Sequence, residues 1–153
     1  MSENPKNFSR MQLTVLIVLR VLIGYHFLFL GLEKLFNPSW SAAGFLLQAN
    51  GLFAGFYQSM AADASTMAMI DFLNTWGQIF IGAGMIAGAF SRLACWAGAL
   101  LLFLYYTANP PFMSGYFFID KNMLEFLAIV LLALFPTSHL IGIDHFFNKT
   151  GSA

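Results

Sequence analysis

Two residues of a kind that can exchange protons lie within long apolar stretches of this sequence. His26 falls in the first stretch and Glu125 in the last. Imidazole and carboxylate groups are common general acids and bases in proteins. With about 1.5 Å of rise per residue in a helix, both side chains would lie at a similar depth, where they could pair. We therefore predict His26 and Glu125 as the catalytic candidates.

A cation makes the first apolar stretch costly to place in an apolar medium. Arg20 lies near its middle, where a charge costs roughly 2.5 to 3.5 kcal/mol on insertion scales. At about 100° per residue, one helical face holds Arg20, Gly24, Phe27, Gly31 and Lys34. The two glycines on this face would let another helix approach closely. We therefore predict that Arg20 points into a bundle, and that Arg20 and Lys34 could bind a ligand there.

The other apolar stretches also carry polar side chains, each near the end that would lie at the level of Glu125. These further candidates for binding a ligand are Trp76, Gln78, Tyr105, Asn109, Lys121 and Asn122. Two interpretations remain open. The groups could hydrogen-bond one another and fix the register of the helices. Alternatively, they could line a pocket for a ligand with a polar head and an apolar tail, such as a quinone.

Four apolar segments must position these residues, at about 11–32, 70–90, 93–108 and 119–135. Each approaches the length of a membrane-spanning helix, roughly 20 residues, and the chain is 59% hydrophobic with only 9% charged residues. We therefore predict an all-α membrane protein, a four-transmembrane-helix bundle that forms one domain over residues 1–153.

The connections between and after these segments carry predictions of their own. The apolar connection between the first two segments predicts an interfacial helical loop, broken near Gly51, with a half-inserted hairpin as the alternative. Residues 137–148 read as another short interfacial helix. On the second segment, Gly77, Gly84 and Gly88 form a stripe of small residues, which predicts packing against a neighbouring helix.

Charged residues predict the orientation and exclude some functions. Lys6, Arg10, Arg92 and Lys149 fall on the side of the termini, so the positive-inside rule predicts that both termini are cytoplasmic. Seven basic and seven acidic residues leave no net charge, which argues against nucleic acid as a partner. Cys95 is the single cysteine, which excludes an internal disulfide. No ligand set for a metal or a haem is evident.

Three segments carry a resemblance to a known family: residues 20–38 (RVLIGYHFLFLGLEKLFNP), 76–92 (WGQIFIGAGMIAGAFSR) and 120–125 (DKNMLE). They resemble the DoxX/DoxD family of small bacterial four-helix membrane proteins. This family includes the membrane subunit of thiosulfate:quinone oxidoreductase, so the resemblance implies a quinone-linked subunit in the bacterial inner membrane. The positions where family members carry polar residues match Arg20, Lys34, Asn122 and Glu125.

The polar residues and the resemblance together predict a membrane subunit of a quinone-linked oxidoreductase complex, with quinone as its cofactor. Arg20 or Lys34 would stabilise the quinone anion, and Trp76 and Tyr105 would line the ring site. Electrons would have to come from a partner protein.

Two alternatives stay open. The chain could be a non-catalytic membrane anchor or assembly subunit of a larger complex, or a small carrier of lipid or solute. The expected partners are membrane lipids, together with other proteins of a membrane complex or further copies of this chain.

Overall fold

The computed structural model describes residues 8–114 and 118–145, and in this part of the chain every regular element is a helix. In chain order the elements are α1 (Arg10–Leu35), α2 (Ala43–Leu47), α3 (Ala54–Ala62), α4 (Ala64–Ala87), α5 (Ser91–Ala108), the 3-10 helix η2 (Pro111–Ser114) and α6 (Lys121–Leu134). The all-α prediction is confirmed. The four long helices coincide with the four predicted apolar segments, although α4 begins at Ala64 rather than near residue 70.

Three of the long helices begin where a side chain accepts a hydrogen bond from the first turn of the backbone. Ser9 caps α1. Asp63 accepts from the backbone nitrogen of Thr66 at 2.8 Å at the start of α4. Asp120 accepts from that of Met123 at 2.8 Å at the start of α6. These caps satisfy N–H groups that a helix leaves unpaired, and the Asp63 cap explains why α4 starts earlier than its apolar segment.

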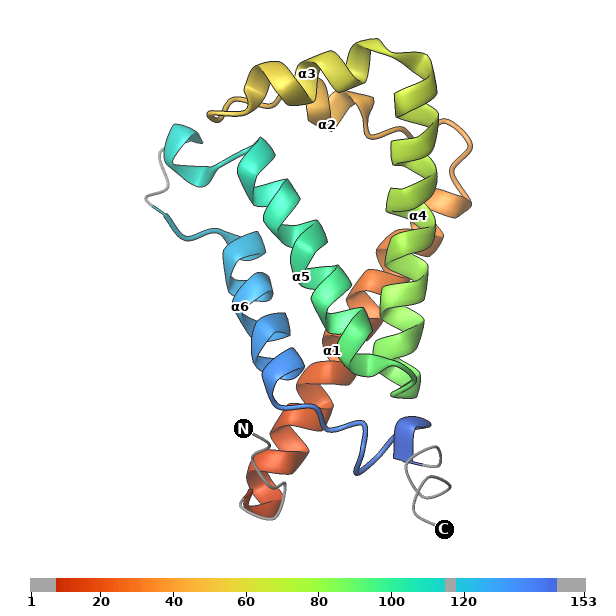
Figure 1. Cartoon of the computed structure of the whole chain (residues 1–153), viewed down its shortest axis with the longest axis vertical. Coiled ribbons are helices and arrows are strands. Elements are labelled where there is room, and N and C mark those ends of the chain that lie inside the picture. The colour runs from red at the N-terminus through yellow and green to blue at the C-terminus, as the bar shows by residue number, and fades with distance from the viewer. Residues whose placement is uncertain (1–7, 115–117, 146–153) are drawn as a thin grey trace.

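Two pairs of helices, α1 with α4 and α5 with α6, lie side by side and form the bundle (Figure 1). A Cβ atom at Gly24 would lie 2.9 Å from the Cβ of Met85, and one at Gly82 would overlap the backbone nitrogen of Leu28. The predicted glycine face of α1 is therefore a close helix contact. The prediction for α4 is wrong at Gly77, where a Cβ would have no described atom within 4 Å. Gly82 makes the crossing instead.

Helices α2 and α3 cross one end of the bundle, and α1 begins at the opposite end, where the last described residues also lie (Figure 1). The two short helices flank Gly51, as the interfacial-loop prediction expects. This arrangement leaves the bundle with a covered end and a terminal end, and each holds a cluster of buried polar groups.

At the terminal end, residues 138–143 form turns and bends and residues 144–145 are helical, so the prediction of a helix over 137–148 is wrong for residues 137–143. Residues 146–148 lie outside the described chain. The backbone nitrogens of Ile143 and Asp144 donate to the carbonyls of Ala87 and Gly88 at 3.0 and 2.9 Å. These hydrogen bonds hold the segment against the end of α4.

The apolar core lies between the four long helices and includes Ile23, Phe27, Ile81, Met85, Cys95 and Ile129. Many large apolar side chains on the outer faces of the same helices remain exposed. Within the described residues, α1 and α5 are long and apolar enough to cross a membrane.

Candidate functional site

A cavity of about 320 Å³ lies among α1, α4, α5 and α6, next to the segment that leads into α2. Its polar lining comes from all four long helices: His26, Lys34, Asn74, Gln78, Tyr105, Lys121, Asn122 and Glu125. Its apolar lining includes Phe27, Leu30, Phe45 and Leu102. A volume above roughly 300 Å³, with apolar walls and a few convergent polar groups, is typical of a small-molecule site.

One wall of the cavity is a chain of hydrogen bonds that runs from α1 through α4 to α5. Lys34 Nζ donates to Asn74 Oδ1. Asn74 Nδ2 and Gln78 Nε2 both donate to Tyr105 Oη, at 2.7 and 3.3 Å. Because an ammonium group has only donors, Lys34 holds the Asn74 oxygen toward itself and the amide nitrogen toward Tyr105. The phenol oxygen thus accepts both bonds, and its own proton remains available to donate.

One acceptor and one donor on this wall have no hydrogen-bond partner within the described chain. Gln78 is 2% exposed, and its Oε1 is buried without a partner. The Tyr105 hydroxyl accepts from its two neighbours but donates to no described residue. A buried polar group without a partner costs about 1 to 3 kcal/mol, and native proteins leave few of them. A molecule in the cavity that offers a donor to Gln78 and an acceptor to Tyr105 would satisfy both.

His26 and Glu125 meet on another wall of the cavity, where α1 faces α6. His26 Nε2 lies 3.8 Å from Glu125 Oε1, which makes an ion pair whenever the imidazole is protonated. The His26 side chain is half exposed, whereas the Glu125 side chain is largely buried. The predicted approach of these two residues is therefore confirmed. The pair connects the cavity with the outside of the bundle.

The segment between α1 and α2 contributes an aromatic wall. Lys34 Nζ lies 4.5 Å from the centre of the Trp40 ring, a distance at which cation and ring attract each other. Phe45 on α2 meets Tyr105 edge-on, with 5.4 Å between ring centroids. Asp71 Oδ1 accepts from the N-cap residue of α2 at 2.7 Å, which ties this segment to α4.

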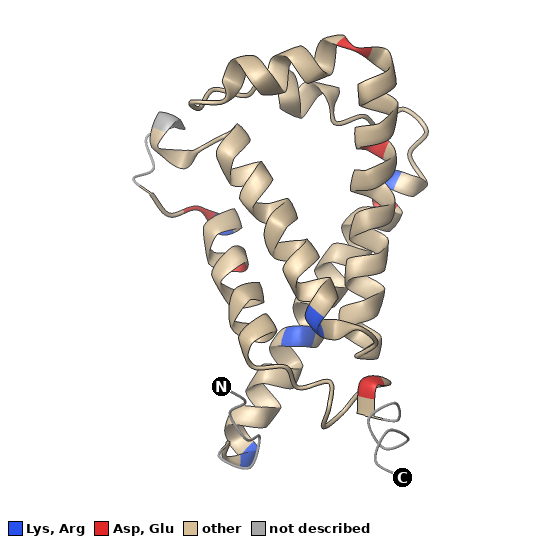
Figure 2. Cartoon of the chain, viewed as in Figure 1, with Lys and Arg blue, Asp and Glu red and all other residues tan. Residues whose placement is uncertain are grey.

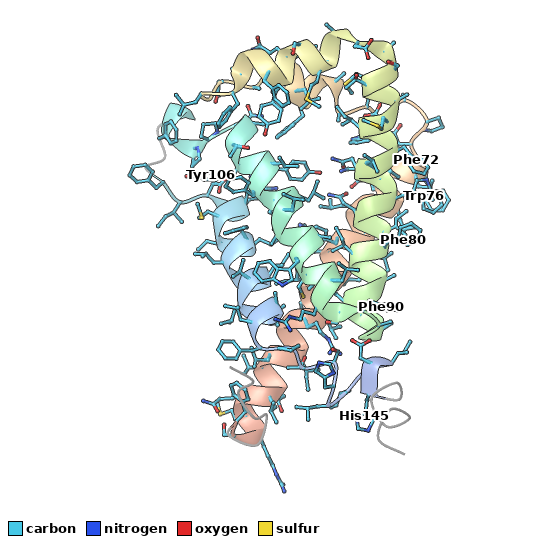
Figure 3. The ribbon with its side chains drawn as sticks, viewed as in Figure 1. Phe72, Trp76, Phe80, Phe90, Tyr106 and His145 are labelled. Atoms are coloured by element: carbon cyan, nitrogen blue, oxygen red, sulfur yellow. The ribbon has the colours of Figure 1, made fainter. Side chains whose placement is uncertain are left out.

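Seven of the ten predicted site residues line the cavity: His26, Lys34, Gln78, Tyr105, Lys121, Asn122 and Glu125. The structure does not bring the other three to it. Trp76 stacks with Phe80 on the outer face of α4, at 5.8 Å between ring centroids (Figure 3). Asn109 donates to the backbone carbonyl of Phe45 at 3.4 Å.

Arg20, the third of these residues, is 3% exposed and lies toward the terminal end of the bundle. Its Nη1 donates to Thr137 Oγ1 at 3.1 Å, and its Nη2 donates to the carbonyl of Ile141 at 2.8 Å. Its Nε has no partner among the described residues. The guanidinium therefore points into the bundle, as predicted, but it binds the chain's own C-terminal segment.

Asp144 completes this terminal cluster by capping α5. Its two carboxylate oxygens accept from the backbone nitrogens of Phe90 and Ser91, at 2.8 and 3.3 Å. Phe90 adopts a left-handed conformation with φ 49°, a strained geometry for a bulky residue, and the Asp144 bond helps to hold it. Burial raises the pKa of the Asp144 carboxyl, but hydrogen bonds, including those from these two backbone groups, hold it below its ordinary value.

Sequence reasoning did not single out two residues that shape the cavity, Asn74 and Trp40. A signal for Asn74 was present, because it lies four residues before Gln78 and so shares its helical face. No such spacing marks Trp40, which the turn after α1 brings to the cavity.

Comparison of the chain with protein-family models, with curated proteins and with solved structures finds no match. The geometry of the cavity therefore carries the functional conclusion.

Proposed function

We propose that this chain is a four-span protein of the bacterial cytoplasmic membrane that binds the head group of a quinone in the cavity between its helices. The observation that carries the proposal is the wall formed by Asn74, Gln78 and Tyr105. This wall has one unused donor and one unused acceptor, and its residues line a cavity that combines aromatic and aliphatic walls with further polar groups from α1 and α6. The resemblance to the DoxX/DoxD family implies the same ligand.

Exposed apolar surface supports the membrane part of the proposal. Of the most apolar 18 residues in α1 and in α5, 28% and 39% are buried, whereas the core helix of a water-soluble protein is mostly buried. Lipid is the solvent that suits such faces. Helix α6 has 14 residues, or about 21 Å of rise, so the bilayer is expected to thin beside it.

Charge supports the proposed orientation, with both termini in the cytoplasm. Positively charged segments gather toward the end where α1 begins, and acidic segments predominate toward α2 and α3 (Figure 2). Arg10 and Arg92 belong to the first end, at the starts of α1 and α5. Cytoplasmic loops carry an excess of Lys and Arg. The cavity would then lie in the outer half of the membrane.

The chemistry of the wall fits both redox forms of a quinone. A quinone carbonyl is an acceptor that the Tyr105 hydroxyl can bind, and the hydroxyl of the reduced form is a donor that Gln78 Oε1 can accept. A cavity of about 150 Å³ can hold benzene, so about 320 Å³ has room for a substituted ring. Lys34 already binds Asn74 and Trp40, so its charge is held at the wall.

His26 and Glu125 are suited to hold and pass a proton at the mouth of the cavity. They are 3.8 Å apart, and one is half exposed while the other is largely buried. Such a pair can carry a proton between the outside and the cavity. Electrons would come from a redox protein bound to the chain.

Native purification tests the proposal. The protein is extracted gently from its own membranes, and mass spectrometry identifies bound lipids and co-purifying proteins. The proposal expects a near-stoichiometric quinone whose amount is reduced in Gln78→Leu and unchanged in Phe80→Leu, a matched control on the outer face of α4. A stable protein complex without quinone would contradict the proposal and favour an anchoring subunit. A bound lipid of another class would favour a carrier.

A further inference from the structure

We infer that a second cavity, on the other side of Phe45 and Tyr105, binds the hydrocarbon tail of the ligand whose head group occupies the first. This inference rests on the proposed function for the identity of the head group. The second cavity has a volume of about 200 Å³ and lies among α2, α3, α4 and α5. The two cavities have four lining residues in common: Ala42, Phe45, Asn74 and Tyr105. They are therefore adjacent chambers separated by a thin partition.

The second cavity is lined almost entirely by aliphatic and aromatic groups, with Leu46, Met60 and Leu101 among them. It offers one unused hydrogen bond, the proton of Tyr105, and its other polar groups already have partners. Tyr57 Oη bonds Thr107 Oγ1 at 2.7 Å, and Asn74 is used by Lys34 and Tyr105. Water occupies cavities that offer it several unused hydrogen bonds, whereas apolar cavities of this size stay dry and bind apolar molecules. A hydrocarbon group therefore suits this cavity better than water does.

The position of the second cavity gives a tail a route from the lipid. Leu73 on α4 and Leu104 on α5 line the cavity and are also exposed on the surface of the bundle. The cavity therefore opens between α4 and α5. Helix α3 crosses the bundle at that end (Figure 1). A tail that enters there leads its head group toward the partition. The side chain of Phe45, on the five-residue helix α2, contacts Tyr105 at that partition.

Lipid and the second cavity are both apolar. A hydrocarbon tail is therefore equally removed from water in either place, and the hydrophobic effect does not favour the cavity over the lipid. What the cavity adds is contact: a chain held between fixed walls gains dispersion contacts that a fluid lipid does not supply in one geometry. We therefore expect a moderate preference for a tailed ligand, and a steep dependence on the shape of the cavity.

Two benzoquinones with the same ring, one without a tail and one with a single isoprenoid unit, test the inference. Binding to the full chain in lipid nanodiscs is measured at equal mole fractions in the lipid. We expect the tailed compound to bind about tenfold more tightly. Leu101→Phe, which narrows the second cavity, should reduce this preference and keep the affinity for the tail-less ring. Leu100→Phe is the matched control, because Leu100 is 60% exposed on the adjacent position of α5.

A hydrocarbon diazirine that has no head group tests the cavity without reference to quinone. After irradiation in nanodiscs, it should label Leu46 and Ala108, which line the cavity and are buried from the surrounding lipid. Leu101→Phe should reduce that labelling, and Leu100→Phe should not.

The outcomes separate this inference from the proposed function. Equal affinity of the two quinones for the unmodified chain would overturn the tail site and leave the head-group site standing. Labelling of Leu46 and Ala108 without binding of either quinone would retain a hydrocarbon site and refute quinone as its ligand. Absence of labelling at both positions would overturn the hydrocarbon site itself.

Discussion

The two ends of the bundle each bury polar groups, but they use them differently. At the terminal end, Arg20 bonds Thr137 and Ile141, and Asp144 caps α5. At the covered end, Gln78 Oε1 and the Tyr105 hydroxyl proton have no partner in the described chain, and both residues line a cavity. The first cluster joins parts of the fold, and the second is prepared for a ligand. The terminal end also buries an atom without a partner, Arg20 Nε, so an unmade bond points to a ligand only where it lies in a cavity that several helices line with polar groups.

Both ends of the bundle depend on the close contact of α1 with α4. A substitution at this contact should therefore disrupt both ends and have the largest effect. Gly82→Ala places a methyl group against the backbone of α1 and should cost about 3 kcal/mol. Gly77→Ala, five positions earlier on the same helix and facing open space, should instead stabilise by about 0.5 to 1 kcal/mol because it removes a glycine from a helix. Unfolding in SDS, followed by circular dichroism, measures both. Equal effects would refute the crossing at Gly82.

Removing the cation at the terminal end should affect that end alone. Arg20→Leu loses the two hydrogen bonds that the charged guanidinium donates but also removes the cost of burying the charge. We therefore expect the free energy of unfolding to fall by about 1 to 2 kcal/mol. Hydrogen exchange should rise at the amides of Ile143 and Asp144, which bond the end of α4. Quinone affinity should stay the same. A loss of affinity comparable with that of a cavity variant would show that the two ends are not independent.

At the covered end we expect the opposite result: a variant that loses quinone affinity and keeps its stability. Gln78→Leu keeps the size of the side chain, removes a buried acceptor that has no partner and gives up one long hydrogen bond. Stability should therefore be unchanged or slightly higher, while quinone affinity falls about tenfold, or 1.4 kcal/mol. Paired measurements of SDS unfolding and of quinone binding check this. A clear loss of stability would place Gln78 among the groups that hold the fold.

Acid should loosen the terminal end through Asp144, and this is the smallest effect. Because the pKa of this carboxyl is held below its ordinary value, its contribution is complete above the ordinary pKa, near 4, and is lost as the pH falls toward the lower folded-state value. Protection of the Phe90 and Ser91 amides against hydrogen exchange, corrected for intrinsic rates, should fall over that window. Asp144→Asn should flatten the dependence, and an unchanged acid response in this variant would refute the assignment.

Asp63 provides an internal comparison for the same experiment. Hydrogen bonds from Ser65 and Thr66 lower its pKa to about 2, so the start of α4 has its own loss of capping in acid. Only the peptides at the start of α5 report on Asp144, and their response should disappear in Asp144→Asn while that of α4 remains.

The local sequence pattern was sufficient to predict the helices and the inward face of α1. The periodicity and the length of an apolar segment depend only on residues that are close in the sequence. The pattern also predicted that His26 lies close to Glu125. It did not reveal the partners of Arg20, which lie 117 and 121 residues away. The position of Arg20 near the middle of an apolar segment indicates that the cation needs a partner, but it does not identify that partner. The choice between Gly77 and Gly82 likewise depended on a rotation of α4 that only packing against α1 determines.

The central claim is that the first cavity binds a quinone head group, and Trp40 allows a direct test because it lines that cavity. Replacement of Trp76 and Trp96 by Phe leaves Trp40 as the only tryptophan of the chain. A tail-less quinone is then titrated into the protein in nanodiscs while Trp40 fluorescence is recorded. We predict saturable quenching that Gln78→Leu shifts to about tenfold higher quinone concentration. Quenching that rises linearly without saturation, and is the same in the variant, would contradict the claim.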